Sequence, residues 1–432
     1  MTCTRRRSEP NSPAPAFATM KVAAAIAVAV SLTAVGEASA QTRARDLGVP
    51  FDGTPGPLNA ITDVAGVEVG HVTLIEGSGR LVVGEGPVRT GVTAILPRGR
   101  SGPDSTFAAT FSLNGNGEMT GTAWIEESGQ LDGPILITNT HSVGVVRDAV
   151  IRWEVENRPD FLWALPVVAE TYDGILNDIN GFHVTPEHVF QAIEGARGGA
   201  VAEGSVGGGT GMLCNGFKGG IGTASRVLPE RGGGWTVGVL VQCNYGSQNS
   251  VLIGGIPVGR QLLREGLRGL CRGDIEPTLE FLRGLPRCDG AGGAAGPGAR
   301  PDAPLPELGS IIVVVATDAP LLPHQLERIA TRVTLGLGRL GSIAGNGSGD
   351  LFIAFSTAAR GIGAEEGLVP LEMLPNDRMD WLFSAVVQAT EEAVVNAMVA
   401  ADTMTGVDGI TARGIPHDRL RAILREHGRL VE

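Results

Sequence analysis

Residues 238–255 read GVLVQCNYGSQNSVLIGG, and the rest of the chain is organised around this stretch. Apolar residues alternate from Trp235 to Val241 and predict one strand, and the apolar run that begins at Val251 predicts a second strand. The residues between the two runs are small, polar or glycine, and they end in Asn249 and Ser250. The sequence therefore places a hydroxyl residue at the start of a buried strand.

Ser250 becomes a chain terminus if the peptide bond after Asn249 is cut. A free α-amine has an unperturbed pKa of about 8, so near neutral pH it can accept the proton of the serine's own hydroxyl. Ser250 Oγ can also make the cut itself, by attacking the Asn249 carbonyl to form an ester that water then hydrolyses. The alternative is a hairpin loop in which Ser247, Asn249 and Ser250 only form the turn.

Residues 1–40 have the composition of a leader followed by a secretory signal peptide. Residues 1–19 hold three arginines and show no periodic apolar pattern, and a lysine then precedes an apolar run over residues 22–35. An Ala-Ser-Ala motif follows, so we expect cleavage before Gln41. The apolar run is short for a membrane span, and a retained membrane anchor is the alternative. We therefore expect a soluble protein that is periplasmic or secreted.

The net charge of the chain limits the classes of partner that it is expected to bind. The formal charge is −12, and removal of the four basic and two acidic residues in the first 40 moves it to −14. An acidic protein without a block of lysine and arginine is a poor candidate for binding nucleic acid or an anionic membrane. We expect small or cationic partners instead.

The cysteines are too few to form the scaffold of the fold, so the core must be hydrophobic. Cys271 and Cys288 can pair across a loop in an oxidising compartment, whereas Cys214 and Cys243 lie in apolar surroundings and are expected to be buried thiols. Neither the cysteines nor the histidines have the spacing of a zinc site. We expect no metal and no cofactor.

Periodic apolar patterns predict a layered α/β protein. A stretch rich in glycine, alanine and proline, residues 290–306, is expected to be a surface loop or a disordered insert. No linker separates the two halves of the chain except the proposed cut, so we expect one domain, with residues 41–249 and residues 250–432 interleaved in one core after that cut. The predicted strands cover residues 67–72, 92–96, 135–137, 311–316 and 351–355, and the predicted helices cover residues 142–155, 185–196, 258–270, 323–340 and 381–401.

Residues 113–122 form the first segment with possible chemistry. Two Asn-Gly pairs favour a tight turn, so an ordinary hairpin is one interpretation. The other depends on three acids around that turn, Glu118, Glu126 and Glu127, because a carboxylate directed into a cleft can bind a substrate ammonium group. The sequence does not choose among the three.

Residues 207–220 form a second segment, in which glycine lets the backbone approach a ligand and direct N–H groups at it. Gly211, Gly216 and Lys218 miss the phosphate-loop pattern, because no Ser or Thr follows the lysine. An oxyanion hole built from a backbone amide or from the Asn215 side chain suits acyl transfer better. A glycine-rich turn is the alternative.

Residues 346–350, Asn-Gly-Ser-Gly-Asp, form a third segment and lead directly into a predicted strand. Asp350 can orient the hydroxyl of Ser348, and that hydroxyl can orient a nucleophile or its amine. Taken alone, this is also a common loop composition.

Together these segments resemble a family of self-processing serine aminopeptidases, which contains the L-aminopeptidase/D-amidase/D-esterases and the β-peptidyl aminopeptidases. The resemblance covers essentially the whole chain after residue 40. The motifs that carry it are DVAGVEVGH at 63–71, the turn at 114–121, TNTHSVG at 138–144, FKGGIGTASR at 217–226, the Asn249–Ser250 junction and NGSGD at 346–350.

The resemblance implies a four-layer α/β/β/α sandwich shared with the ornithine acetyltransferase group. It also implies cleavage before the nucleophile, hydrolysis of small peptides, amides or esters that have a free amine, and assembly into homo-oligomers of the cleaved pair. Ser250 matches the nucleophile, Asn215 the oxyanion-hole side chain, and Ser348 with Asp350 the Ser-x-acid relay.

Two positions depart from the family pattern. The acid in well-known β-aminopeptidases is a glutamate, so Asp350 is a shorter version of it. Some members place a tyrosine near the Thr-Asn-Thr segment, where this chain has His141. We expect His141, Glu118 and Gly211 to contact substrate.

Two other functions remain open at this point. The same fold and nucleophile can act on a pantetheine-like amide, or can transfer an acyl group to an amine instead of to water. A periplasmic binding protein, in which the Asn249–Ser250 bond stays intact, belongs to a different class. That alternative predicts one uncut chain and no reaction with acylating inhibitors.

Overall fold

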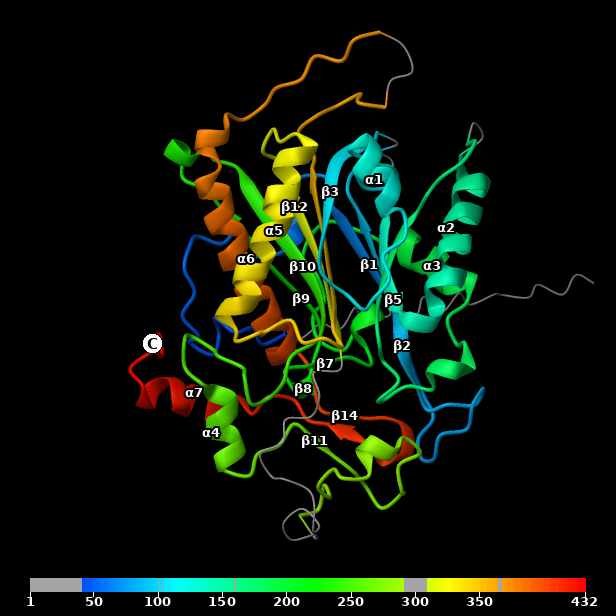
Figure 1. Cartoon of the computed structure of the whole chain (residues 1–432), viewed down its shortest axis with the longest axis vertical. Coiled ribbons are helices and arrows are strands. Elements are labelled where there is room, and N and C mark those ends of the chain that lie inside the picture. The colour runs from blue at the N-terminus through cyan, green and yellow to red at the C-terminus, as the bar shows by residue number, and fades with distance from the viewer. Residues whose placement is uncertain (1–40, 101, 103, 159–160, 291–308, 364–366) are drawn as a thin grey trace, which may run out of the picture. The chain divides into compact units, whose positions relative to one another are not determined.

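The computed structural model describes residues 41–432 except 101, 103, 159–160, 291–308 and 364–366. The expected leader and signal peptide, and almost all of the expected loop at 290–306, lie outside the described residues. Figure 1 shows two main sheets with helices on the outer face of each. None of the helices in the described ranges has the length and apolar composition that crossing a membrane requires.

The first sheet has four strands in the order β1-β2-β5-β6. Its pairs are antiparallel except β5 with β6, which is parallel. Helices α2 and α3 cover its outer face, where Val92, Leu136 and Val168 pack against them. The bounds are β1 Glu68–Glu76, β2 Val88–Leu96, β5 Ile135–Asn139, β6 Val167–Thr171, α2 Val143–Asn157 and α3 Pro186–Glu194.

The second sheet has six strands in the order β4-β3-β13-β12-β10-β9. Helices α5 and α6 cover its outer face. Strands β12 and β13, which follow Ser250 in the sequence, are parallel to each other and lie between β10 and β3, which precede it. The bounds are β3 Thr106–Gly115, β4 Gln130–Leu131, β9 Gly220–Val227, β10 Thr236–Asn244, β12 Ser310–Thr317, β13 Gly349–Ser356, α5 Pro323–Arg339 and α6 Asp380–Val399.

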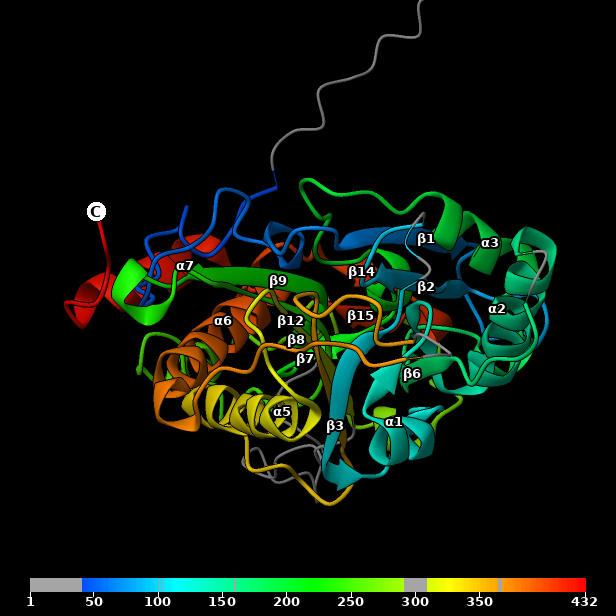
Figure 2. The same ribbon diagram turned by 90° about the horizontal axis from the view of Figure 1, so that it is seen from above.

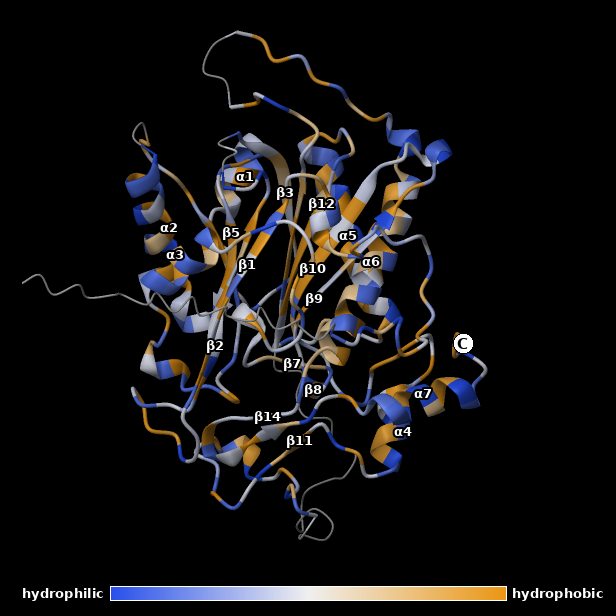
Figure 3. Ribbon diagram, turned by 180° about the vertical axis from the view of Figure 1, so that it is seen from behind, coloured by the Kyte–Doolittle hydropathy of each residue, from blue (hydrophilic) through white to orange (hydrophobic). Residues whose placement is uncertain are grey.

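The alternation of side chains along β12 shows how the layers pack. Val313 and Val315 face α5 and α6, whereas Ile312 and Val314 face the four-stranded sheet. Because every residue of the strand is buried, its sequence is a continuous apolar run. The layers therefore follow the order α/β/β/α, which confirms the predicted sandwich. Figure 2 shows the two helix pairs on opposite sides of the strands. Figure 3 shows that hydrophobic residues gather on both sheets.

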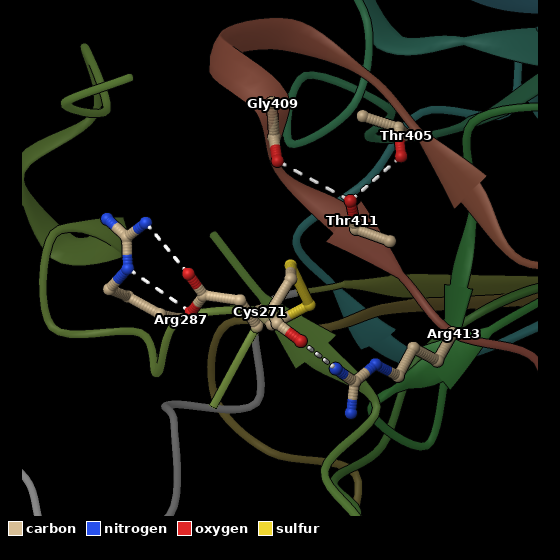
Figure 4. Close-up of a disulfide and its surroundings, with 8 residues drawn as sticks. Cys271, Arg287, Thr405, Gly409, Thr411 and Arg413 are labelled. Carbon is tan, nitrogen blue, oxygen red and sulfur yellow. Dashed lines mark hydrogen bonds and ion pairs between the residues drawn. A yellow bond between two sulfur atoms is a disulfide. The ribbon is translucent and has the colours of Figure 1, made fainter. Parts of the chain in front are cut away.

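Smaller elements lie beyond the ends of the main strands. They include a three-stranded sheet in the order β11-β15-β14. Cys271 of β11 forms a disulfide with Cys288 and so closes the loop between these two residues (Figure 4). The sequence had left this pairing open. Arg413 donates to the Cys288 carbonyl at 3.0 Å. The bounds are α1 Thr122–Ser128, α4 Val258–Arg264, α7 His417–Glu426, β7 Leu213–Cys214, β8 Phe217–Lys218, β11 Leu270–Cys271, β14 Met404–Thr405 and β15 Thr411–Ala412.

The predicted strand at Val251 is wrong. Gly254 and Gly255 both have positive φ and turn the chain back, so Ile253 pairs only with Ile256 in an isolated bridge. The alternative interpretation of a hairpin is also wrong, because β10 pairs with β9 and β12 instead. Ser250 therefore lies in a loop between strand β10 and helix α4.

Candidate active site

Ser250 lies at the end of a tight turn that begins at Ser247. The Ser250 N–H donates to the Ser247 carbonyl at 3.1 Å, and Ser250 Oγ donates to the same carbonyl at 3.0 Å. The two hydroxyls are 3.1 Å apart. These contacts fold the serine hydroxyl back onto its own turn, next to the Asn249–Ser250 peptide bond.

Asn215 lies against the residues that lead into this turn. Its backbone N–H donates to the Tyr245 carbonyl at 2.7 Å, and its φ of +50° is unusual for a residue with a side chain. The buried Nδ2 contacts two sulfur atoms, Cys214 Sγ at 3.7 Å and Met398 Sδ at 3.6 Å. Sulfur is a weak acceptor, so the amide loses little when it turns to a stronger acceptor such as an oxyanion.

The residues next to Asn215 correct one prediction. Cys214 and Cys243 are not buried thiols but form a disulfide bond, with a Cα–Cα distance of 5.4 Å. The bond joins the residue before Asn215 to the next-to-last residue of β10. Their separation of 29 residues gave no sign in the sequence that the two cysteines are neighbours.

Ser348 directly precedes β13 and Asp350 is the second residue of that strand, and the hydrogen bond predicted between them is present. Ser348 Oγ donates to Asp350 Oδ1 at 2.6 Å, and both residues are buried. Between them, the Gly349 N–H donates to Ser310 Oγ at 3.2 Å. This contact ties the Ser-x-acid segment to the first residue of β12.

The register of the six-stranded sheet brings these candidates to one end. Asn244 is opposite Ser310, and Asp350 is beside Ile311 and opposite Asn114. Ser250 follows Asn244 by six residues at this same end. Its hydroxyl, however, bonds within its own turn, to the hydroxyl and the carbonyl of Ser247.

The Asn114 turn is not a hairpin, because the chain crosses from β3 to the other sheet, where Met119 bridges Ala169. Asn114 Nδ2 donates to the Gly345 carbonyl at 2.5 Å, and Asn116 Nδ2 donates to the Gly347 carbonyl at 2.8 Å. The turn therefore supports the loop before Ser348. Of the three candidate acids, Glu118 is exposed on this turn, and Glu126 and Glu127 are exposed on α1.

Glu170 is a buried acid that no sequence motif singled out. It is buried at the end of β6, where it accepts hydrogen bonds from the Glu118 N–H at 3.0 Å and from the Thr140 hydroxyl. Burial raises the pKa of its carboxyl. A Cβ at Gly117 would lie 3.3 Å from Glu170 Oε1 and 3.2 Å from Gly349 Cα, so Glu170 is close to the Ser-x-acid segment. An acid directly after a short apolar run was the signal in the sequence.

The other two expected substrate contacts differ in exposure. His141 is exposed and stacks on Phe182, with 6.3 Å between ring centroids. Gly211 is buried, and a Cβ there would collide with the Arg89 carbonyl and lie 2.8 Å from Asp173 Cβ. Close packing therefore accounts for this glycine.

Lys218 supports the glycine-rich segment from inside. It is fully buried, and its Nζ donates to the carbonyls of Gly209, Met212 and Gly219 at 3.4, 2.9 and 2.7 Å. Burial lowers its pKa to about 7. Its partners are all backbone carbonyls, so the lysine holds the loop on which Asn215 lies.

Comparisons with known proteins agree with this geometry. The β-peptidyl aminopeptidase BapA of Sphingosinicella microcystinivorans is 54% identical over 398 residues, which cover 92% of this chain and 95% of that protein. A β-aminopeptidase from a Burkholderia species has a similar structure, with a TM-score of 0.75 and 45% identity over 90% of this chain and 99% of that one.

A second solved structure is the L-aminopeptidase D-Ala-esterase/amidase of Ochrobactrum anthropi, described as a prototype for the serine aminopeptidases and as a variant of the Ntn hydrolase fold. Its TM-score is 0.76, with 46% identity over 90% of this chain and 99% of that one. The family model for peptidase family S58 matches residues 59–412. This match, together with relatives that share about half of their residues over nearly the whole chain, shows that the protein belongs to peptidase family S58.

Proposed function

We propose that this protein is a self-processing serine aminopeptidase, cut between Asn249 and Ser250, which removes N-terminal residues from short peptides, amides or esters. The observation that carries the proposal is the position of Ser250. Its hydroxyl lies in a tight turn next to the bond to be cut, at the same sheet end as Asn215, Ser348 and Asp350. Membership of a peptidase family supports the class of reaction.

In the proposed hydrolysis, Ser250 Oγ attacks the carbonyl of the substrate and its own free amine accepts the proton. The Asn215 amide then donates to the oxyanion, a contribution worth about 3–4 kcal/mol per donor in known cases. Ser348, held by Asp350, orients the hydroxyl and the amine. Water attacks the acyl-enzyme in the second step and restores Ser250.

We also propose that the substrate binds through its free amine, and that β-amino acids are accepted at its N-terminus. The names of the Sphingosinicella and Burkholderia relatives support the β-amino acid. The exposed Glu118 carboxylate on the Asn114 turn supports recognition of an ammonium group. Hydrolysis rates for matched p-nitroanilides of β-alanine, L-alanine and D-alanine test this preference.

Export and assembly complete the proposal. Two disulfides in the described chain favour an oxidising compartment, in agreement with the signal peptide expected before Gln41. Assembly into homo-oligomers of the cleaved pair follows from the family resemblance. Cell fractionation tests the location, and light scattering on the purified protein tests the assembly.

The decisive experiment is intact mass and N-terminal sequencing of the purified wild type beside Ser250→Ala, with Ser247→Ala as the matched serine control. We expect two chains from wild type and from Ser247→Ala, the second beginning Ser250-Val251-Leu252, and one chain from Ser250→Ala. Each disulfide lies within one expected chain, so a denaturing gel without reductant should already separate the two. A single wild-type chain that starts near Gln41 contradicts the proposal and favours a binding protein.

A further inference from the structure

The carbonyl that self-cleavage would attack already has a charged hydrogen-bond donor. Arg260, on the first turn of α4, donates from Nε to the Asn249 carbonyl oxygen at 3.1 Å. This is the carbonyl whose oxygen becomes an oxyanion when Ser250 Oγ adds to its carbon. A guanidinium is always charged near neutral pH and is a stronger donor than a neutral amide.

Close packing holds α4 against this junction. A Cβ at Gly259 would collide with the Gln248 carbonyl oxygen and lie 2.6 Å from a methyl carbon of Val251. On the other side, a Cβ at Gly341, which has a φ of +88°, would collide with the Ser250 carbonyl oxygen. Two glycines thus let the backbone on both sides approach the junction, and the position of Gly259 brings its neighbour Arg260 to the carbonyl.

We propose that Arg260 is a catalytic residue of self-cleavage, where it stabilises the oxyanion on Asn249; this rests on the proposed function. Ser250 Oγ forms a bond to the Asn249 carbonyl carbon, the C–N bond to Ser250 breaks, and the hydroxyl proton passes to the Ser250 nitrogen. Water then hydrolyses the ester, which returns a hydrogen to Oγ and leaves a carboxylate on Asn249. Arg260 donates to the same oxygen throughout.

Ser250 takes part in two proposed reactions, and each reaction has its own oxyanion donor. In the uncut chain, Arg260 contacts the Asn249 carbonyl, while the Asn215 amide contacts sulfur atoms. Arg260 therefore serves the single cleavage of the chain, and Asn215 serves the repeated hydrolysis of substrate. After the cut, the Arg260 guanidinium pairs with the new carboxylate of Asn249 and holds that chain end beside the site.

The test is the rate at which the labelled full chain converts to two chains after cell-free translation is stopped. Arg260→Gln removes the charged donor, whereas Arg260→Lys keeps a charged donor on a side chain of different shape. Arg264→Gln is the control, because Arg264 is an exposed arginine on the same helix. Loss of one donor from a buried oxyanion hole slows the reaction about 100- to 1000-fold. Arg260 is exposed, so we expect Arg260→Gln to be about 10- to 100-fold slower, with Arg260→Lys between it and wild type.

Chemical rescue separates a role in the reaction from a role in folding. We expect millimolar ethylguanidinium to accelerate cleavage of Arg260→Gln and to leave wild type and Arg264→Gln unchanged. Equal rates for Arg260→Gln and wild type would overturn the proposal, and so would a slow variant that ethylguanidinium does not rescue. A wild-type chain that is never cut is a different result, because it removes the proposed function itself.

Discussion

Cys214 and Cys243 are joined by a disulfide that connects the residue before Asn215 to the strand that leads into the Ser250 turn. The bond holds the candidate oxyanion donor, Asn215, close to the strand that leads to the proposed nucleophile, Ser250. We therefore expect it to position the proposed site as well as to stabilise the fold.

Replacing both cysteines by alanine should reduce stability and activity together. By the loop-entropy relation, a bond that spans 29 residues contributes about 3–4 kcal/mol to the free energy of unfolding. We also expect kcat to fall about tenfold or more, because Asn215 loses its anchor. The control is Cys271→Ala/Cys288→Ala, which should lose stability but keep kcat. Urea unfolding and steady-state kinetics measure both effects, and equal kcat values for the two double variants would contradict a positioning role.

Asn215 offers a matched pair of substitutions because of its positive φ. Asn215→Ala and Asn215→Gly both remove the amide, but only alanine is strained at this φ, by about 1–2 kcal/mol. We expect both variants to lose about 100- to 1000-fold in kcat, with the alanine variant less stable. The measurement is kcat on a p-nitroanilide substrate, together with thermal unfolding. A glycine variant that keeps wild-type kcat would show that only the backbone conformation matters.

Ser348 and Asp350 should behave as one unit. Asp350→Asn keeps an acceptor for the Ser348 hydroxyl but removes the charge, and Ser348→Ala removes the donor. We expect each to lower kcat about tenfold or more, and the double variant to be no slower than the worse single variant, since effects within one unit are not additive. Fully additive losses in kcat would indicate two independent roles.

Asp173 should make stability depend on pH in a predictable direction. Burial raises its pKa from 3.8 to about 7, although Asn177 Nδ2 donates to its Oδ1 at 3.0 Å. Between these values the folded state keeps a proton that the unfolded chain has released, so the stability contributed by Asp173 is lost as pH rises through the window. The slope is roughly 1.4 kcal/mol per pH unit at most.

Asp173→Asn stays neutral and should remove this slope. We therefore expect the free energy of unfolding of Asp173→Asn, relative to wild type, to be more favourable at about pH 8 than at about pH 5. Denaturant titrations at the two pH values measure the difference, with the exposed Asp377→Asn as the control. The same difference at both pH values would mean that Asp173 has the same charge in the folded and unfolded states.

The sequence predicted the layers of this protein better than the details of its site. Strands buried on both faces, such as β12 and β13, are continuous apolar runs, and amphipathic helices such as α5 have a clear period, so both were located within a few residues. The helix at Val258 was predicted too long, because it ends at Arg264. Helix α1 was not predicted, because it has only seven residues and one buried side chain.

The contacts of the site depend on residues that are distant in the sequence. Glu170 accepts a hydrogen bond from the backbone of Glu118, which is 52 residues earlier in the sequence, and no local sequence pattern connects these two residues. The pairing of Cys214 with Cys243 likewise depends on how β7 meets β10 in the folded chain. The Ser348–Asp350 bond was predictable because its partners are two residues apart.

The order of strands in the six-stranded sheet has a consequence for refolding, if the chain is cut at Asn249–Ser250 as proposed. Strands β12 and β13 would then belong to the second chain, but they lie between β3 and β10 of the first. The uncut chain folds as a unimolecular reaction, whereas two separated fragments must find each other, so refolding becomes second order and depends on protein concentration. Persistence of the mature enzyme is then governed by its unfolding rate. Cleavage would thus convert a protein that refolds as one chain into one whose refolding requires two chains to associate.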